Sequence, residues 1–257
     1  MNCSINHQLN QESEKELFNH AWQPLVYQDL QGQRVPYIAI EGVKGVGKGT
    51  VLKIVRERLA MFGVSALALN PTQALGSNHY WEQLDQALPL RHLDWWKERL
   101  YAARSQVHSH RVYEELIQKQ STEHKVDLVL GDRSIFTSLV TRWPDHTSNE
   151  TITACYQKVR QLECSIPLPD QVIYLEADLK TINDRLHGRE RHYGLEDETQ
   201  ARIMSAMEAY QCLANSRVAP FDEVIWSTID ATQSIEQTVS QIMEIVLERL
   251  NFVPDAL

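Results

Sequence analysis

Residues 41–50 read E-G-V-K-G-V-G-K-G-T, and no other stretch of the chain says as much about its chemistry. Gly42, Gly47 and Lys48 match the first seven positions of the phosphate-loop pattern G-x-x-x-x-G-K-[ST]. In such a loop the glycines let the backbone curl so that successive N–H groups point at one anion. The lysine adds a mobile positive charge. The stretch therefore predicts a site for the phosphates of a nucleotide.

The segments on either side of this loop fit the prediction. Residues 37–40 form a short apolar run that is typical of a buried strand. Behind the loop, apolar residues recur at helical spacing, at Val51, Ile54, Val55, Leu59 and Phe62. The positive end of such a helix would face the same anion as the loop. A chance glycine-rich turn is the alternative, and the predicted strand and helix argue against it.

The eighth position of the loop differs from the usual pattern. Gly49 stands where a Ser or Thr hydroxyl commonly meets a magnesium ion, and Thr50 follows it. The ending G-K-G-T occurs in nucleoside monophosphate kinases of the adenylate kinase type. We therefore expect an intact site in which Thr50 serves the metal.

Composition limits the class of protein. The chain has 257 residues, 43% hydrophobic and 23% charged, which suits one soluble α/β domain with at most a small appendage. The net charge of -9 makes nucleic acid an unexpected partner. No apolar run approaches the ~18 residues of a membrane span, and residues 1–20 contain no apolar signal-peptide core. We expect a cytoplasmic protein without a membrane partner, with free thiols at its widely spaced cysteines, Cys3, Cys155, Cys164 and Cys212.

Strand and helix patterns alternate along the chain. Apolar runs predict four further strands, at residues 64–69, 126–130, 171–175 and 224–229. Helical patterns cover residues 93–122, 152–162, 179–187, 196–218 and 234–250. We therefore predict an α/β fold over residues 36–257, a P-loop three-layer αβα sandwich with a central five-stranded parallel sheet. Residues 1–35 are expected to form an N-terminal extension, with a short helix between residues 14 and 25.

In a parallel α/β sheet the ligand lies beyond the carboxyl ends of the strands. Asp132 and Arg133 follow the third predicted strand. A carboxylate there, beside a phosphate loop, is where such proteins hold magnesium, although Asp132 could also be a plain turn residue. The planar guanidinium of Arg133 suits phosphate oxygens, with a surface ion pair as the alternative.

A basic stretch follows the fourth predicted strand. Residues 184–191 read D-R-L-H-G-R-E-R, so Arg185 and Arg189 are four apart and would share a helix face. A solvated basic loop is one interpretation. The other is a lid at about residues 185–196 that closes over the phosphates and excludes water.

Four segments together resemble bacterial thymidylate kinases. They are Y-I-A-I-E-G-V-K-G-V-G-K-G-T (37–50), Y-A-A-R-S-Q (101–106), G-D-R-S (131–134) and I-D-A-T-Q (229–233). Many families share the phosphate loop alone, whereas the order and spacing of all four segments are much more specific. The resemblance runs from about residue 37 to the C-terminal helix.

The resemblance implies roles for individual residues. It implies that ATP is bound by Gly42, Lys44, Gly45, Val46, Gly47, Lys48, Gly49 and Thr50, with Asp230 and Ala231 near adenine. Asp132 would handle Mg²⁺, and Arg104 and Arg133 would hold the base and phosphate of the acceptor nucleotide. The catalytic set would be Lys48, Asp132, Arg185 and Arg189. The family is commonly dimeric, which implies a homodimer formed through the long helices.

Three acceptor-side positions depart from the family pattern. Lys44 replaces an acidic loop residue that contacts the acceptor sugar. Asn70 stands in what the family shows as an Arg-Glu-Pro run. Residues 140–142 read V-T-R in place of an Ala-Tyr-Gln triplet that helps recognise thymine. We therefore add Asn70 and Arg142 to the candidate acceptor contacts, and the acceptor could differ from thymidine monophosphate (dTMP).

The leading hypothesis is a nucleoside monophosphate kinase that transfers the γ-phosphoryl group of ATP to dTMP, giving dTDP. A deoxynucleoside kinase is the first alternative, because Ser134 after Asp132 and Arg133 matches the end of the Glu-Arg-Ser run of those enzymes. That chemistry benefits from a carboxylate base, for which Glu41 is the obvious candidate. The second alternative is a non-catalytic nucleotide-binding regulator, with the N-terminal extension as an interaction arm.

Overall fold

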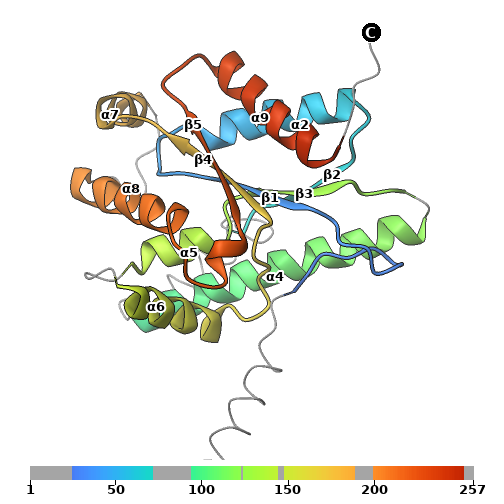
Figure 1. Ribbon diagram of the computed structural model, residues 1–257, viewed down its shortest axis with the longest axis horizontal. Coiled ribbons are helices and arrows are strands. Elements are labelled where there is room, and N and C mark those ends of the chain that lie inside the picture. The colour runs from blue at the N-terminus through green and yellow to red at the C-terminus, as the bar shows by residue number, and fades with distance from the viewer. Residues whose placement is uncertain (1–24, 72–93, 123, 144–147, 189–198, 252–257) are drawn as a thin grey trace, which may run out of the picture.

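Five parallel strands form the centre of the molecule (Figure 1). They are β1 Tyr37–Glu41, β2 Ala66–Leu69, β3 Leu128–Asp132, β4 Gln171–Glu176 and β5 Ile225–Asp230, in the order β2-β3-β1-β4-β5. The structure is a computed structural model that describes residues 25–71, 94–122, 124–143, 148–188 and 199–251. The predicted five-stranded parallel sheet is confirmed.

Helices cover both faces of this sheet (Figure 1). On one face, α2 Lys48–Met61 packs against α9 Ile235–Arg249. The other face is covered by α4 Asp94–Ser121, α5 Ile135–Thr141, α6 Asn149–Leu162 and α8 Gln200–Ala214. α7 Leu179–His187 follows β4 and contacts α8, and the short 3-10 helix η2 Phe221–Glu223 precedes β5. This is the predicted three-layer arrangement.

Strand β1 is buried along its whole length. Tyr37 belongs to the apolar cluster that includes Leu116 of α4, whereas Ile38 belongs to the cluster that includes Val55 of α2. Successive side chains of one strand thus enter the two apolar layers on opposite faces of the sheet. This placement explains why the sequence shows a continuous apolar run there and not an alternating one.

Several element boundaries differ from the predicted ones. β3 begins two residues later than predicted and continues to Asp132, because Gly131 still pairs with Ala39 and Asp132 with Ile40. β2 also begins two residues later than predicted, and α6 begins three residues earlier, because Ser148 caps its first turn. α8 covers residues 200–214 and not 196–218: Thr199 caps its first turn, and Asn215 caps its C-terminal end. The later end of β3 brings Asp132 into the sheet edge itself.

Helix α5 was not predicted from the sequence. Its seven residues, I-F-T-S-L-V-T, include four β-branched side chains and are too few to show a helical period. Ser134 caps the helix by accepting a hydrogen bond from the backbone N–H of Phe136 at 3.1 Å. Phe136 is fully buried, with its ring centroid 4.9 Å from that of Trp226. Tertiary packing therefore decides the conformation of this segment.

The described part of the N-terminal extension packs on the domain. Gln28 and Arg34 form an antiparallel bridge, and Tyr27 and Val35 are buried in the apolar cluster of α4. The ring of Tyr27 stands edge-on to that of Tyr37, with 5.7 Å between centroids. The division of the chain at residue 35 stays a prediction. The predicted helix between residues 14 and 25 lies outside the described residues, except for the last of them.

Two predictions from composition can be compared with the structure. Within the described ranges, every helix is too short or too polar to cross a membrane. Cys155, Cys164 and Cys212 are free thiols, as predicted, and Cys3 lies outside the described residues.

The burial of α4 against the sheet can be tested by a matched pair of variants. Leu116 is fully buried, whereas Val107 on the same helix is 38% exposed. Leu116→Ala should lower the free energy of unfolding by about 2–5 kcal/mol, because it removes packed methyl groups and leaves a cavity. Val107→Ala should change it by less than about 0.5 kcal/mol. Equal losses in urea denaturation would contradict the placement of α4.

Candidate active site

The phosphate loop connects β1 to α2 and packs tightly against the neighbouring strand. Gly42 has a φ of 143°, and a Cβ atom there would lie 2.7 Å from the carbonyl oxygen of Leu175 in β4. Gly47, directly before α2, has a φ of 110°. Both conformations favour glycine over residues with a side chain. The glycines of the sequence pattern thus stand where the backbone needs them.

Lys48 lies folded back over the loop. Its Nζ atom donates hydrogen bonds to the carbonyl oxygens of Gly42 at 2.6 Å and Val43 at 2.9 Å, and the residue is 7% exposed. These bonds hold the ammonium group beside the loop backbone. The position fits the predicted role of Lys48 as the charge that meets nucleotide phosphates.

The start of α2 is left open to an anion. Gly47 offers no side-chain cap, and the first turn of the helix contains no acidic residue. The first N–H groups of a helix have no partner within the helix and carry the positive end of its dipole. In the same loop Lys44 is partly buried, and Thr50 is exposed in the first turn. Loop and helix therefore form a site of the kind that binds phosphate.

Arg185 joins three segments of the site. From α7 it donates one hydrogen bond to the carbonyl oxygen of Val46 in the loop, at 2.8 Å. It donates a second to the carbonyl oxygen of Ala231 behind β5, also at 2.8 Å. The sequence predicted a charge-stabilising lid arginine. The structure places Arg185 against the loop itself, whereas Arg189 lies outside the described residues.

A cavity of about 400 Å³ lies beside these bonds. Its lining includes Gly45, Gly47, Thr50, Arg185, Ala231 and Gln233. The residues predicted for the ATP phosphates are thus brought together with Ala231, which was predicted to lie near adenine. The adjacent Asp230 accepts hydrogen bonds from the hydroxyl and the backbone N–H of Thr232, which lower the pKa of Asp230.

Asp132 and Asn70 meet at the ends of two neighbouring strands. Nδ2 of Asn70 donates to a carboxylate oxygen of Asp132 at 3.3 Å. Both residues border a cavity of about 680 Å³ that extends along α2 past Gly49 and Lys53. Asn70, a departure from the family pattern, therefore lies close enough to orient the predicted metal-binding carboxylate.

The backbone at Arg133 has an unusual conformation. Arg133 has a φ of 78°, in the left-handed region that side chains other than glycine rarely adopt. Its N–H donates to the carbonyl oxygen of Ile40 at 3.1 Å, and its carbonyl accepts from the hydroxyl of Tyr37 at 3.4 Å. At Gly131 an added Cβ would lie 2.9 Å from the ring of Tyr37. The motif G-D-R-S therefore fits closely against β1.

The donors at the site limit how it could hold a metal ion. Among the described residues, no group of three or more His, Cys, Asp or Glu side chains could hold a metal ion. Mg²⁺ does not need such a group, because it is usually bound through one or two carboxylates, waters and substrate phosphates. A single carboxylate at Asp132 beside a phosphate loop fits that mode.

Arg104, which was predicted to contact the acceptor nucleotide, lies on α4. Its Nε atom is buried and makes no hydrogen bond with any described residue, and its guanidinium lies 4.9 Å from the centroid of Tyr101. Burial lowers the pKa of Arg104 from its usual value, and the positive charge of Arg133 acts in the same direction, whereas Tyr101 and Glu163 oppose it. A guanidinium with an unsatisfied donor suits contact with an anion.

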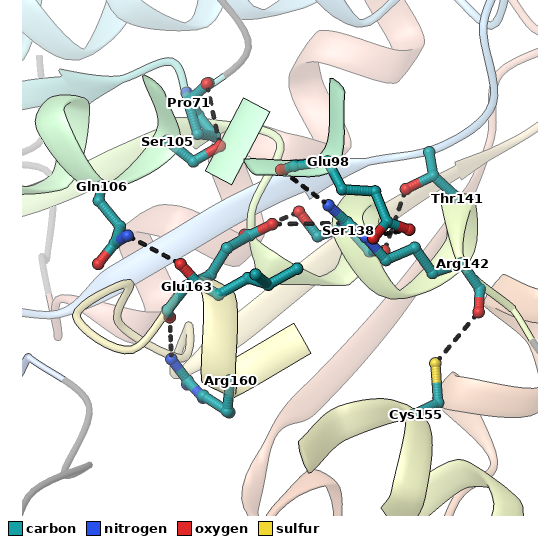
Figure 2. Close-up of polar contacts among 11 residues, drawn as sticks. Pro71, Glu98, Ser105, Gln106, Ser138, Thr141, Arg142, Cys155, Arg160 and Glu163 are labelled. Carbon is teal, nitrogen blue, oxygen red and sulfur yellow. Dashed lines mark hydrogen bonds and ion pairs between the residues drawn. The ribbon is translucent and has the colours of Figure 1, made fainter. Parts of the chain in front are cut away.

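Arg142 is tied into a network of polar contacts that joins α4, α5 and the end of α6 (Figure 2). Its Nη1 atom donates to the carbonyl oxygen of Ser138 at 3.1 Å and lies 3.4 Å from a carboxylate oxygen of Glu163. Its Nε atom lies 3.6 Å from a carboxylate oxygen of Glu98. The predicted contact of Arg142 with the acceptor would compete with these partners, and it stays a prediction.

Sequence reasoning missed Glu163, the centre of this network. The residue is 1% exposed and accepts a hydrogen bond from the hydroxyl of Ser138 at 2.8 Å. Burial raises the pKa of Glu163, while Ser138 and the arginines around it act in the opposite direction. Gln106 ties the motif Y-A-A-R-S-Q to this region by donating to the carbonyl oxygen of Leu162 at 2.8 Å (Figure 2). No local pattern marks Glu163, because the side chains that contact its carboxylate, Ser138 and Arg142, belong to the segment of α5.

Glu41, the candidate base of the alternative hypothesis, is enclosed. The residue is 0% exposed, and both carboxylate oxygens accept hydrogen bonds, from Ser134, Thr137 and Tyr210. A base must reach the proton that it removes. The geometry does not favour that role for Glu41.

Comparison with known proteins adds an independent finding. The family model described as thymidylate kinase matches residues 40–242. Two similar curated proteins are named thymidylate kinase. They come from Leptospira interrogans serogroup Icterohaemorrhagiae, serovar copenhageni (strain Fiocruz L1-130) and serovar Lai (strain 56601). Each is 22% identical over 225 residues, which cover 86% of this chain and 98% of the relative.

The fit of the loop against β4 predicts opposite effects for two glycine substitutions. Gly42→Ala would place a methyl group on the carbonyl of Leu175 at a strained φ, so it should lower the free energy of unfolding by about 1–3 kcal/mol. Gly49 lies in the first turn of α2 with no atom within 4 Å of an added Cβ. Gly49→Ala should leave stability unchanged or raise it by up to about 1 kcal/mol. Similar losses for both variants in urea denaturation would contradict the described loop.

Proposed function

We propose that this chain, which belongs to the thymidylate kinase family, transfers the γ-phosphoryl group of ATP to dTMP. Membership of the family makes the chain an ATP-dependent phosphotransferase that acts on a nucleoside monophosphate. The identity of the acceptor, the use of Mg²⁺ and the assembly into a homodimer are part of the proposal.

The observation that carries the proposal is the meeting of two positively charged groups at the carboxyl ends of the strands. Lys48, the loop and Arg185 form the donor side. Arg104 on α4 and Arg133 behind β3 supply the positive charge of the acceptor side, and the charge of Arg133 helps to lower the pKa of Arg104. Two phosphate-bearing substrates need two such groups, and phosphoryl transfer between them depends on alignment and neutralisation of charge.

The acceptor needs no strong general base. A phosphate monoester with a second pKa near ~6 is largely ionised at neutral pH and is already nucleophilic. The chain would therefore orient the acceptor phosphate through Arg133 and neutralise the transferring charge through Lys48. Asp132 would hold Mg²⁺, which when bound supplies further neutralisation of the phosphate oxygens.

A deoxynucleoside kinase is less well supported. Its acceptor is a hydroxyl, which benefits from a nearby base, and Glu41 has both oxygens engaged away from solvent. A non-catalytic regulator would not need all three of the residues Lys48, Asp132 and Arg185. At Lys44, Asn70 and Arg142 the chain differs from the family pattern, and these differences are compatible with an acceptor base other than thymine.

The test is a phosphoryl-transfer assay with ATP and Mg²⁺ over a panel of nucleoside monophosphates and deoxynucleosides. We expect transfer to dTMP that is abolished by excess EDTA. Lys48→Ala should lose turnover by about 10²-fold or more, with an unfolding transition that shows the fold retained.

Each other outcome of this assay has a distinct meaning. Preferred transfer to a deoxynucleoside would support a deoxynucleoside kinase. Preferred transfer to another nucleoside monophosphate would show that dTMP is not the acceptor. ATP binding in calorimetry without transfer to any acceptor would support the regulator. Near-normal turnover by the Lys48→Ala protein would contradict the role of Lys48.

A further inference from the structure

A buried carboxylate stands directly before the phosphate loop. Glu41 ends β1 and is 0% exposed. Its Oε1 atom accepts hydrogen bonds from the backbone N–H and the hydroxyl of Ser134, both at 2.7 Å. Its Oε2 atom accepts from the hydroxyls of Thr137 and Tyr210, both at 2.8 Å. Four short bonds from three residues therefore satisfy one carboxylate.

The geometry suits an ionised carboxylate held by neutral donors. An ionised carboxylate only accepts hydrogen bonds, and all four partners can donate. Burial, and next the negative charge of Glu41, raise the pKa of Tyr210 well above its usual value, so its phenol keeps the proton that it donates. Within the described part of the chain, no ion pair is formed by Glu41. Burial of a charge without a countercharge costs free energy, which indicates that the Glu41 carboxylate has a role other than packing.

The two carboxylate oxygens of Glu41 bind residues in different parts of the molecule. Among the residues that the structure describes, Oε1 accepts hydrogen bonds only from Ser134, which follows Arg133 and caps α5. Oε2 reaches Thr137 inside α5 and Tyr210 on α8. One side of the carboxylate thus faces the acceptor-side loop, and the other side faces the supporting helices.

Contacts from β1 enclose the left-handed residue Arg133. The N–H of Arg133 is bound to the carbonyl of Ile40, and the next N–H, that of Ser134, is bound to Glu41. The carbonyl of Arg133 accepts from Tyr37 at 3.4 Å. A non-glycine residue at positive φ persists only where its surroundings over-determine it. The bonds to Ile40 and Glu41 fix the peptide groups on either side of Arg133.

We infer that Glu41 is a positioning residue for the acceptor. Through Ser134 it holds Arg133 in the backbone conformation that directs the guanidinium toward the acceptor phosphate. The inference rests on the proposed function for the identity of that acceptor. Glu41 itself contacts neither substrate and transfers no proton.

A matched pair of variants separates positioning from stability. Ser134→Ala and Thr137→Val each remove one hydroxyl donor from the same carboxylate, on its two different oxygens. Ser134→Ala should weaken dTMP binding and raise its KM about 3- to 10-fold, the effect expected for one hydrogen bond, with the KM for ATP unchanged. Thr137→Val, with Tyr210→Phe as a second control, should lower stability but leave both KM values near those of the wild type.

Substitution of Glu41 itself provides a rescue test. Glu41→Met keeps the length of the side chain but replaces both carboxylate oxygens by a thioether, a weak acceptor. The binding of dTMP should therefore fall at least about tenfold, since both bonds to Ser134 are lost. Glu41→Gln can still present its carbonyl oxygen to Ser134, while the hydroxyls of Thr137 and Tyr210 can turn to accept from its NH₂ group. It should therefore restore dTMP binding to within about threefold of the wild type, because the bonds to Ser134 remain.

The readouts are dTMP and ATP titrations by calorimetry, steady-state KM and kcat, and urea denaturation for every variant. Equal dTMP affinities for Ser134→Ala and Thr137→Val at equal loss of stability would overturn the inference, even if Glu41→Met fails to fold. Wild-type protein that binds dTMP but transfers no phosphoryl group would refute the proposed function alone, and the dTMP titrations would still decide the role of Glu41. Wild-type protein that binds no dTMP would overturn both.

Discussion

The position of β1 between β3 and β4 is the constraint on which the site depends. Its register sets Ile40 opposite Asp132 in β3 and opposite Ile173 in β4, so β1 and β3 end at nearly the same level, while β4 continues to Glu176. The phosphate loop and the segment that follows Asp132 therefore leave the sheet side by side. A slip of this register by one residue would turn every β1 side chain to the opposite face and take the Glu41 carboxylate away from Ser134, Thr137 and Tyr210.

The chain is acidic overall, but positive charge is concentrated at the phosphate loop, where an anionic ligand would bind. The chain carries a net charge of -9, yet the positive charges of Lys48 and Arg185 are held beside the loop by hydrogen bonds to backbone carbonyls. The buried carboxylates of Glu41 and Glu163 are satisfied by hydroxyls, one backbone N–H and Arg142. Positive potential is thus local and belongs to the site, as phosphate binding requires.

Sequence reasoning found the parts of this structure that are encoded locally. The phosphate loop and the buried strands leave marks within a few neighbouring residues, namely glycine spacing and apolar runs, so their existence and order could be predicted. Helix α5 and the role of Glu41 could not, because the bonds that define them join residues 93 and 96 positions apart. Glu163 was missed for a similar reason, since its carboxylate is bound by Ser138 and Arg142, which lie 25 and 21 residues earlier in the chain. Patterns of hydrophobicity indicate which face of an element is buried, but they do not indicate which buried polar groups find each other.

The structure also gives a physical reason why the arginine at position 142 depends on residues of other helices. An arginine at position 142 is 11% exposed at its side chain and needs the carboxylates of Glu98 and Glu163 as partners. If Arg142 alone were changed to the glutamine of the family pattern, Glu163 would lose its closest countercharge while remaining 1% exposed. Removal of one partner from a buried ion pair commonly costs 3–5 kcal/mol, about as much as binding a substrate group can return. Position 142 is therefore coupled to the packing of α4, α5 and α6, and it can change readily only together with residues that keep the buried charge of Glu163 paired.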